Sequence, residues 1–527
     1  MRPIAGIPAA LAAIVMWVPT GRGADGETPA AETGKARAQV VEAVVAANGD
    51  FALRLYERAA KGRSRANLFF SPYSMSSVLA MAAEGARGET ALEMGTVLGY
   101  PASLRRTGEQ AKATPWDMET IHRGMAALHA RFNPEEGSER KALREKLAML
   151  RKQLDEANDR VMRPRVGDTE PQRKAQAIAA EINRLQVQVD QYELRTANAL
   201  WGDKGYPFAP GYLGTIRRYY KTGQLSLVDF PGDFDGACRQ INAWVDRQTN
   251  GRIKDIIDPG SVDQSSRDLM RLVLTNAVYF HGQWKEVFQE SNTTQEDFYV
   301  PQGQAMIVPL MHQTQEAGYA AFRSDGSFFD TPDRIARGET DQKKLYPGAG
   351  GFQMLELPYK GDALSMVLLL PQARESLAGL EKKLTARNLA EWIKKLRGRE
   401  VEVFVPKFRL SADLDMGKLL QEMGMVRVFR QPQWPQGAQL DGMTNSDDPL
   451  HKLYIYRVAH RAFVDVNEKG TEAAAATVMF SGGGACAAPD DTVPFTPVFR
   501  ADSPFVFLIR DRQTGLILFI GRLVNPR

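Results

Sequence analysis

Cysteine and histidine are scarce in this sequence. Its 527 residues include only two cysteines, Cys238 and Cys486, and six histidines. No Cys-x-x-Cys and no His-Glu-x-x-His pattern occurs, so a disulfide scaffold is excluded and a zinc or iron–sulfur centre is disfavoured. We therefore expect no metal and no cofactor. The stability of the chain must then come from a packed core.

Charge of one sign and long apolar runs are also missing. Lys and Arg number 67 against 63 Asp and Glu, and so small an excess disfavours an electrostatically driven nucleic-acid binder. The N-terminal apolar stretch, residues 4–18, has 15 residues, fewer than the ~20 that a membrane-spanning helix needs. We expect no nucleic-acid partner and no membrane span.

The first 36 residues have the composition of export and linker segments. Arg2 precedes the apolar stretch, and the small residues Gly21 and Gly23 follow it at positions suited to cleavage. This pattern predicts a signal peptide over residues 1–23 and a disordered linker over residues 24–36. The protein would then be secreted or periplasmic. An uncleaved anchor is the alternative, which the short apolar stretch disfavours.

Helical spacing dominates the first part of the chain, and strand composition the last. Apolar spacing predicts helices over residues 40–60, 74–83 and 89–98, and β-rich runs predict strands over residues 272–280, 366–370 and 401–405. Residues 324–350 are rich in Gly, Asp and Lys and are predicted to form a surface-loop insertion. The class is therefore α+β.

Residues 133–190 differ in composition from their surroundings. Apolar residues recur at three- and four-residue intervals over 143–161 and again over 178–192, and a turn-forming stretch separates the two runs. Two heptad helices with a short connection predict an antiparallel helical hairpin. The first helix is locally basic, and a solvated face is a better interpretation than a polyanion site.

Motifs for enzyme chemistry are weak. A Gly-x-Gly-x-x-Gly match at residues 21–26 overlaps the end of the predicted signal peptide and follows no strand, and no Walker A loop or Gly-x-Ser-x-Gly elbow occurs. His460 lies near Asp465, as in part of a triad, but an isolated histidine among apolar strand residues is more often a hydrogen-bonded core residue. We expect the chain not to be an enzyme.

The most informative stretch lies near the C-terminus. A strand with alternating pattern ends at Glu468, Gly470 follows, and small residues dominate positions 471–477. A glycine-rich segment comes next, before two strands predicted over residues 503–509 and 516–520. A loop of this length between core strands is usually functional.

These motifs together resemble the serpin family. The segment N-E-K-G-T-E-A-A-A-A-T at residues 467–477 is close to the family's inhibitory hinge pattern. Other similar segments are spread over the chain, at residues 67–74, 196–201, 241–253, 274–284, 355–361, 405–408 and 504–505. The resemblance covers about residues 37–527, which we expect to form a serpin domain interrupted by insertions at 133–190 and 324–350.

The resemblance implies both a fold and an activity. The fold would have a large central mixed β-sheet, two further sheets, a helical cluster and an exposed reactive loop near the C-terminus. The activity would be suicide-substrate inhibition of a serine or cysteine protease, which attacks a bait bond in the loop and forms an acyl-enzyme. The cleaved loop then inserts as a new strand of the large sheet. We expect a monomer.

The resemblance assigns a hinge that suits strand insertion. A strand that enters a sheet must carry small side chains on its buried face, because a buried charge is costly and proline cannot complete the ladder. Thr471, Ala473, Ala475 and Thr477 alternate on one face. The expected hinge residues are Glu468, Gly470, Thr471, Ala473, Ala474, Ala475, Ala476 and Thr477.

A second group is expected to control opening of the sheet. By the resemblance, this sheet-opening region comprises Ser71, Ser74, Asn276, Trp284 and His460, with Glu468 beside Trp284 where insertion begins. Ordinary packing is the alternative for each of these residues.

The sequence leaves the position of the bait bond undetermined. Family spacing from Gly470 places it near Gly484–Ala485, and a bond on either side of Cys486 is nearly as good. Small residues here predict an elastase-like or other small-residue-preferring target. No Arg or Lys occurs between Thr471 and Phe499, which disfavours trypsin-like proteases.

Two alternatives concern function. The first is a non-inhibitory serpin that acts as a binding, carrier or chaperone protein, which the small hinge residues disfavour. The second concerns the hairpin at 133–190, which has no counterpart in the usual family pattern. We hypothesise a docking arm for a partner there, and a functionally neutral insertion is an equal alternative.

Overall fold

The computed structural model describes most of the chain. The described residues are 34–132, 138–161, 170–189, 192–220, 225–249, 251–267, 270–301, 305–339, 341–446, 448, 452–471 and 495–527. The predicted signal peptide, the hinge residues Ala473, Ala474, Ala475, Ala476 and Thr477, and the bait residues Gly484, Ala485 and Cys486 lie outside them. Helix α1 begins at Gly34, so the last residues of the predicted linker are helical.

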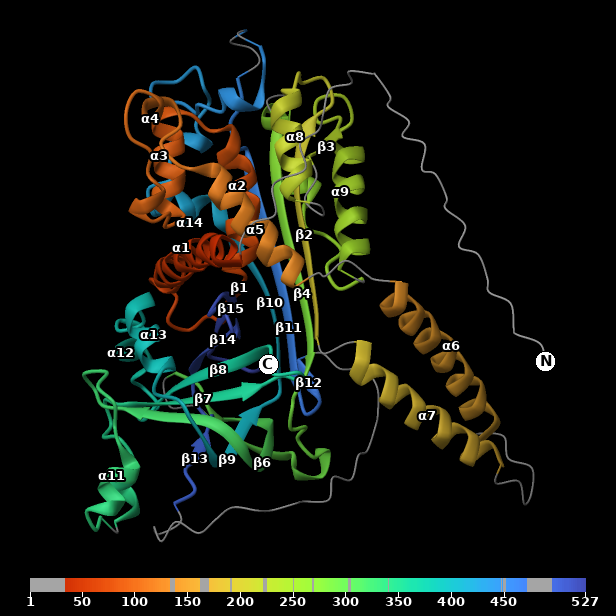
Figure 1. Ribbon diagram of the computed structural model, residues 1–527, viewed down its shortest axis with the longest axis vertical. Coiled ribbons are helices and arrows are strands. Elements are labelled where there is room, and N and C mark those ends of the chain that lie inside the picture. The colour runs from red at the N-terminus through yellow and green to blue at the C-terminus, as the bar shows by residue number, and fades with distance from the viewer. Residues whose placement is uncertain are drawn as a thin grey trace, which may run out of the picture.

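A six-stranded mixed sheet runs along the long axis of the molecule (Figure 1). Its strand order is β10 (Phe408–Asp415), β11 (Arg457–Asn467), β12 (Gly470–Thr471), β4 (Leu272–Gln283), β2 (Tyr192–Asp203) and β3 (Leu225–Val228). The two faces of this sheet are both covered. In β4, Val273 and Ala277 pack under one cluster while Leu274 and Val278 pack into the main core. Burial on both faces explains why buried residues follow one another along β4 without alternating with exposed ones.

The second sheet has nine strands. They are β1 (Leu68–Phe70), β5 (Thr294–Tyr299), β6 (Ala305–Phe322), β7 (Phe352–Pro358), β8 (Leu364–Pro371), β9 (Arg397–Pro406), β13 (Val498–Arg500), β14 (Phe505–Asp511) and β15 (Ile517–Leu523). The long strand β6 pairs with β5, β9 and β7 along successive parts of its length. Its length therefore joins the two further sheets of the prediction into one continuous hydrogen-bonded sheet.

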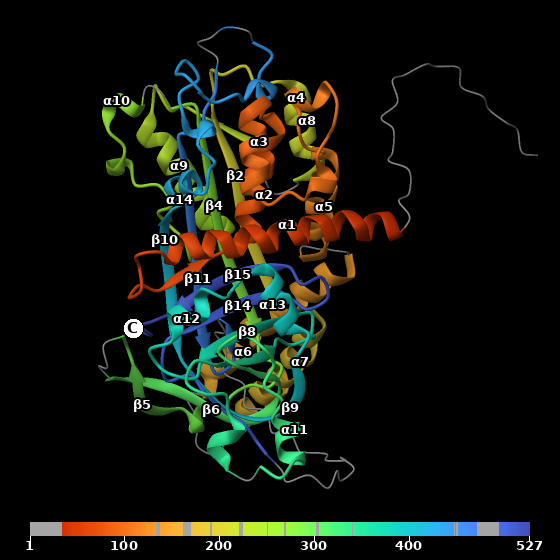
Figure 2. The same ribbon diagram turned by 90° about the vertical axis from the view of Figure 1, so that its left-hand side faces the viewer.

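Helices gather around one end of the six-stranded sheet. They are α1 (Gly34–Ala60), α2 (Pro72–Gly85), α3 (Gly88–Val97), α4 (Gln110–Ala113), α5 (Met118–Phe132), α8 (Pro210–Tyr219), α9 (Phe234–Gln248), α10 (Gln264–Arg267) and α14 (Met416–Glu422). Helix α1 crosses the middle of the molecule (Figure 2). Helix α2 starts after Ser71, whose side chain accepts from the Ser74 amide, and Pro72 fills the first helical position.

The stretch 133–190 contains two helices, α6 (Ser138–Val161) and α7 (Glu170–Val189). They lie side by side, run in opposite directions and extend away from the body (Figure 1). Their apolar side chains form a core of their own, from Leu147, Leu150, Ala157, Ala175, Ile178 and Leu185. The heptad spacing accounts for this pairing because it places one apolar stripe on each helix.

The predicted surface loop at 324–350 has more structure than expected. It contains α11 (Thr331–Ala336), whose N-terminus is capped by Asp330, and a short turn of 3-10 helix at Gln342–Leu345. Phe329 and Leu345 are buried beside these turns. Two further helices, α12 (Leu377–Glu381) and α13 (Ala386–Ile393), lie between β8 and β9 in the chain. The α+β prediction itself is confirmed.

Candidate functional site

The central seam of the six-stranded sheet is open at one end and closed along the rest. Strands β11 and β4 pair directly and in parallel from Arg457 opposite Val273 to Phe463 opposite Tyr279. Beyond that point the two-residue strand β12 lies between them. It is antiparallel to both neighbours, with Gly470 opposite Asn467 and Gln283, and Thr471 opposite Val466 and Gly282. The chain therefore already contributes the first residues of an additional strand.

The reversal from β11 into β12 requires glycine. Asn467 Oδ1 accepts from the Lys469 amide at 3.0 Å and holds the turn. Gly470 has a φ of +152°, and a Cβ added there would lie 2.0 Å from the carbonyl oxygen of Gly282. Only glycine combines this backbone conformation with so close an approach to β4.

The Thr471 side chain points into the core of the seam. It is fully buried, and its Oγ1 lies 2.7 Å from the Tyr359 hydroxyl. Burial raises the pKa of Tyr359, so this hydroxyl stays protonated at any ordinary pH. The Tyr359 ring stacks on the indole of Trp284, with centroids 4.7 Å apart. The Trp284 Nε1 donates to the Asn467 carbonyl oxygen at 2.9 Å and completes a chain of contacts from sheet to hinge.

Backbone hydrogen bonds reinforce the same junction. The amides of Trp284 and Phe288 donate to the carbonyl oxygens of Lys469 and Glu468, each at 2.9 Å. On the other side, the Lys285 amide donates to the Pro358 carbonyl oxygen, also at 2.9 Å. The segment 284–288 thus ties the hinge to the end of β7.

Glu468 is a buried carboxylate with two side-chain partners. It is 5% exposed, lies 2.9 Å from the Lys407 ammonium and accepts from Thr293 Oγ1 at 2.8 Å. Burial opposes its ionisation, but the hydrogen bonds from Lys407, from its own backbone amide and from Thr293 together outweigh burial and hold the pKa of Glu468 below its ordinary value. The carboxylate anchors the end of β11 where the hinge begins.

A buried polar cluster lies farther along the seam. Asn276 Nδ2 donates to Ser74 Oγ at 2.6 Å and to Asn198 Oδ1 at 2.7 Å, and Ser74 Oγ also donates to Asn198. His460 Nδ1 donates to Asn276 Oδ1. Sheet register explains the grouping, because Asn276 lies opposite both Asn198 on β2 and His460 on β11.

The histidine of this cluster is held neutral. Burial lowers the pKa of His460 to about 3, although an interaction with the Asn276 backbone acts in the opposite direction. The cluster joins β2 and β4 on one side of the seam to β11 on the other, and it also includes Ser74 near the start of α2. Opening the seam between β11 and β4 must therefore disturb the contact between His460 and Asn276.

The structure brings together most of the residues expected for sheet opening. Ser74, Asn276 and His460 share one cluster, and Trp284 meets Glu468 and the hinge. Ser71 lies next to this cluster at the start of α2, where its Oγ donates to the Leu518 carbonyl oxygen at 2.7 Å and caps the helix. Its part in sheet opening stays a prediction. The triad alternative is wrong, because Asp465 lies 2.8 Å from the Arg409 Nε and His460 contacts Asn276 instead.

Sequence reasoning missed four partners in this site. They are Asn198, Thr293, Tyr359 and Lys407. Asn198, Tyr359 and Lys407 lie within segments that resemble the family, so the sequence analysis included these residues without assigning them to the site. Their roles depend on cross-strand register, which hydrophobic periodicity does not encode. No motif or pattern in the sequence pointed to Thr293.

Two other kinds of site were looked for in the part of the chain that the structure covers. Within those residues, no helix combines the length and apolarity needed to cross a membrane. The same residues contain no group of three or more His, Cys, Asp or Glu side chains placed to hold a metal ion. Cys238 is buried, and burial raises the pKa of its thiol to about 11. The seam and hinge remain the best candidate.

Comparisons with known proteins show which family the chain resembles. Residues 46–526 match the family model described as Serpin (serine protease inhibitor). An uncharacterized serpin-like protein of Thermococcus kodakarensis is 34% identical over 485 residues, 92% of this chain and 86% of that protein. The leukocyte elastase inhibitor of Bos taurus is 32% identical over 492 residues, 92% of this chain and 100% of that protein. Human thyroxine-binding globulin, a solved structure, has a TM-score of 0.63 at 23% identity, covering 92% of this chain and 99% of that one.

Proposed function

The chain belongs to the serpin family, and we propose that it is an exported suicide-substrate inhibitor of serine or cysteine proteases. The family is one of inhibitors, so the chain is not an enzyme. In the proposed mechanism the protease cleaves the loop between β12 and β13 and becomes attached to it as an acyl-enzyme. The loop then enters the seam before the acyl bond is hydrolysed.

The placement of β12 is the observation that carries this proposal. Insertion extends β12 from Thr471 along the seam, between strands that are now paired with each other. It replaces one ladder, between β11 and β4, with two ladders to the new strand. Each added backbone hydrogen bond contributes about 1 kcal/mol net, so a full strand stabilises the product by several.

The same geometry accounts for trapping. The acyl bond forms on the part of the loop that remains attached to Thr471, so the protease must travel with the inserting strand. Strand β4 has 12 residues, which corresponds to about 40 Å of extended chain. A protease carried toward the far end of β4 is pressed against the body of the inhibitor, and this contact distorts its active site.

The target preference follows from the loop sequence. The proposed bait bond lies near Gly484, Ala485 and Cys486, where the side chains are small. An elastase-like or other small-residue-preferring protease fits such a bond. A relative that bears the name leukocyte elastase inhibitor is consistent with this class of target.

A hinge substitution tests the proposal. Thr471→Arg places a charge in the fully buried position beside Tyr359, which blocks insertion because an unpaired buried charge is costly. Thr496→Arg is the matched control, since Thr496 is exposed on the other flank of the loop. We expect the parent and Thr496→Arg to give a protease complex that survives a denaturing gel, and Thr471→Arg to be cleaved without complex.

One other result would redirect the proposal. Cleavage of the parent chain without a denaturation-resistant complex, for every protease tried, would favour the non-inhibitory alternative. The mass of the released C-terminal peptide locates the bait bond.

Export is tested separately, by the N-terminal mass of the mature protein, for which cleavage after about residue 23 is expected.

A further inference from the structure

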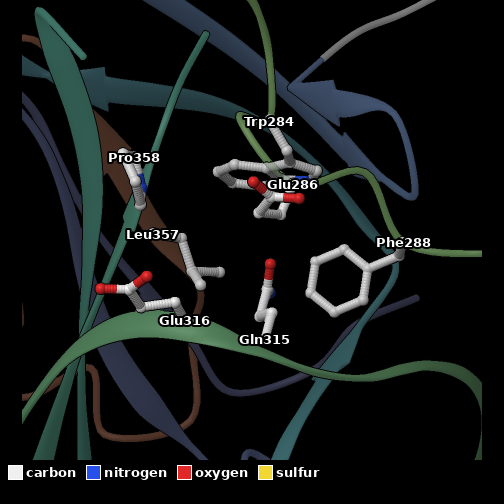
Figure 3. Close-up of a pocket in the computed structure, with 7 residues that line it drawn as sticks. All are labelled: Trp284, Glu286, Phe288, Gln315, Glu316, Leu357 and Pro358. Carbon is white, nitrogen blue, oxygen red and sulfur yellow. The ribbon is translucent and has the colours of Figure 1, made fainter. Parts of the chain in front are cut away.

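The two ends of the loop between β12 and β13 are held by different parts of the molecule. At the first end, Trp284 and Phe288 contact the hinge, and Figure 3 shows the Trp284 ring above Gln315 of β6 with the Phe288 ring to one side. At the second end, residues 495–497 lead into β13, the edge strand of the nine-stranded sheet. The proposed mechanism gives a role to the first end only.

Strand β13 is short and pairs on one side only. Its residues, Val498–Arg500, form a parallel ladder with β9. Arg500 fixes the far end of the strand, because its guanidinium lies 4.5 Å from the Phe404 ring centre and pairs with Glu296 and Asp502. A short edge ladder opens from its less secured end. Release of β13 would therefore begin at its first residue.

The first residue of β13 is held by the segment 324–350. The Val498 amide donates to the Tyr346 hydroxyl at 2.8 Å. The Tyr346 ring also packs edge-on against the Phe495 ring, with centroids 5.5 Å apart. Leu345, the neighbour of this tyrosine, is buried and anchors it to the folded part of the segment.

Arg399 of β9 holds the same stretch from the sheet. Its Nη2 donates to the Phe495 carbonyl oxygen at 3.4 Å, and its guanidinium lies 5.8 Å from the Phe495 ring centre. The same guanidinium lies 6.0 Å from the Tyr319 ring of β6. Tyr346 and Arg399 together form a clamp on the chain just before β13. Figure 1 shows helix α11 of the segment 324–350 and β13 at the same end of the molecule.

The length of the loop shows what this clamp resists. Beyond Gly282, which lies opposite Thr471, β4 has ten further residues. An uncut loop that paired with all of them would use residues 472–481 and leave thirteen residues, 482–494, to return to Phe495. Thirteen extended residues span at most ~45 Å, whereas the return along ten strand positions takes ~34 Å before the chain passes around the sheet. Deep insertion of an uncut loop therefore pulls on the clamp.

We propose that Tyr346 and Arg399 are positioning residues that keep the uncut loop out of the seam, a role that rests on the proposed inhibitory function. While the clamp holds residues 495–498, the loop is tied at both ends and stays available to a protease. Cleavage separates the two ends, so the hinge side inserts while β13 remains in place. The clamp thus makes cleavage the step that starts insertion.

The lifetime of the uncut inhibitor tests this role. The parent chain, Tyr346→Phe and Tyr346→Phe/Arg399→Gln are incubated without protease, and samples taken over time are mixed with excess elastase and scored for the denaturation-resistant complex. We expect trapping capacity to disappear about fivefold faster in Tyr346→Phe, the effect of one hydrogen bond, and faster still in the double variant, while the chain stays monomeric and uncut by mass.

A matched control is a tyrosine outside the clamp. Tyr454→Phe also removes a half-buried hydroxyl, and this variant should keep the lifetime of the parent. Equal lifetimes of the parent and both clamp variants overturn the proposal. A loss of trapping that accompanies cleavage or aggregation overturns it as well.

Hydrogen exchange tests the clamp without reference to inhibition. Exchange is read by mass spectrometry with residue-level fragmentation of the full chain. We expect the Val498 amide to be protected in the parent and to exchange faster in Tyr346→Phe, while the Ala501 amide, which donates to the Phe404 carbonyl oxygen, stays unchanged. Equal exchange of the Val498 amide in both proteins contradicts the clamp. A fresh parent chain that traps no protease contradicts the proposed function instead, and the exchange result still decides whether the clamp exists.

Discussion

At the residue scale, Gly470 and His460 show how single side chains set the state of the seam. Gly470 lets the chain turn back against β4 at a distance that no Cβ would permit. His460 is buried and neutral, and its ring joins β11 to Asn276 on β4. One residue starts the extra strand, and the other holds the remaining seam closed. Both act through a geometry that a change in protonation or a single methyl group would disturb.

The pH dependence of stability should report His460. Its pKa is about 3 in the folded protein and close to 6.5 when unfolded, so only the unfolded chain gains this proton between those values. Stability is thus lost as pH falls below about 6.5, at up to ~1.4 kcal/mol per pH unit. His460→Gln should remove this component from urea-unfolding curves measured between pH 7 and pH 4.

The control for that experiment is a histidine elsewhere. His129→Gln, on α5, removes a histidine without touching the seam. Carboxylates such as Glu468 also contribute to acid destabilisation, so the difference between His460→Gln and the parent is the quantity to compare. Identical pH profiles for these two proteins would contradict a buried neutral histidine.

At the element scale, the residues of the proposed inhibitory site and the helix pair α6–α7 belong to different hydrophobic cores. The seam, the hinge and the polar cluster belong to strands and helices of the main core, whereas α6 and α7 have a core that shares no residue with it. An ion pair of 3.0 Å between Lys146 and Glu181 joins the two helices to each other. We propose that the pair is an insertion that acts as a docking arm for a partner.

Removal of the arm tests this separation. Replacing residues 133–190 by a short Gly/Ser linker should leave the rate of protease trapping and the unfolding midpoint of the body within experimental error, because no main-core side chain is lost. Binding to the partner should disappear. Loss of trapping would show that the arm supports the inhibitory machinery, and unchanged binding to every partner would favour a neutral insertion.

At the scale of the whole molecule, the fold was largely predictable because its motifs are spread over the entire chain. The central seam was less so. Strands β11 and β4 are separated by more than 170 residues in sequence, and their register alone brings His460 and Asn276 together. Periodicity predicts strands but not their neighbours. For this reason Asn198 and Tyr359 were missed, and the helix-capping contact of Ser71 was not foreseen.

The sheets illustrate the same limit. The two further sheets were implied by the family resemblance, and no pattern in the sequence indicated how long β6 is. In the structure this strand covers residues Ala305–Phe322 and pairs with three others. A long strand shared between layers is a property of the assembled fold, since its partners lie far apart in the sequence.

The central claim is that a cleaved loop enters the six-stranded sheet and makes the cleaved molecule more stable than the intact one. Thermal unfolding of the intact chain and of the chain cut once in the loop, by a protease that is then removed, tests this claim most directly. The account predicts a large rise in Tm after cleavage, because two ladders replace the single ladder between β11 and β4. Thr471→Arg should show no such rise. An unchanged or lower Tm in the cleaved parent chain would contradict the account.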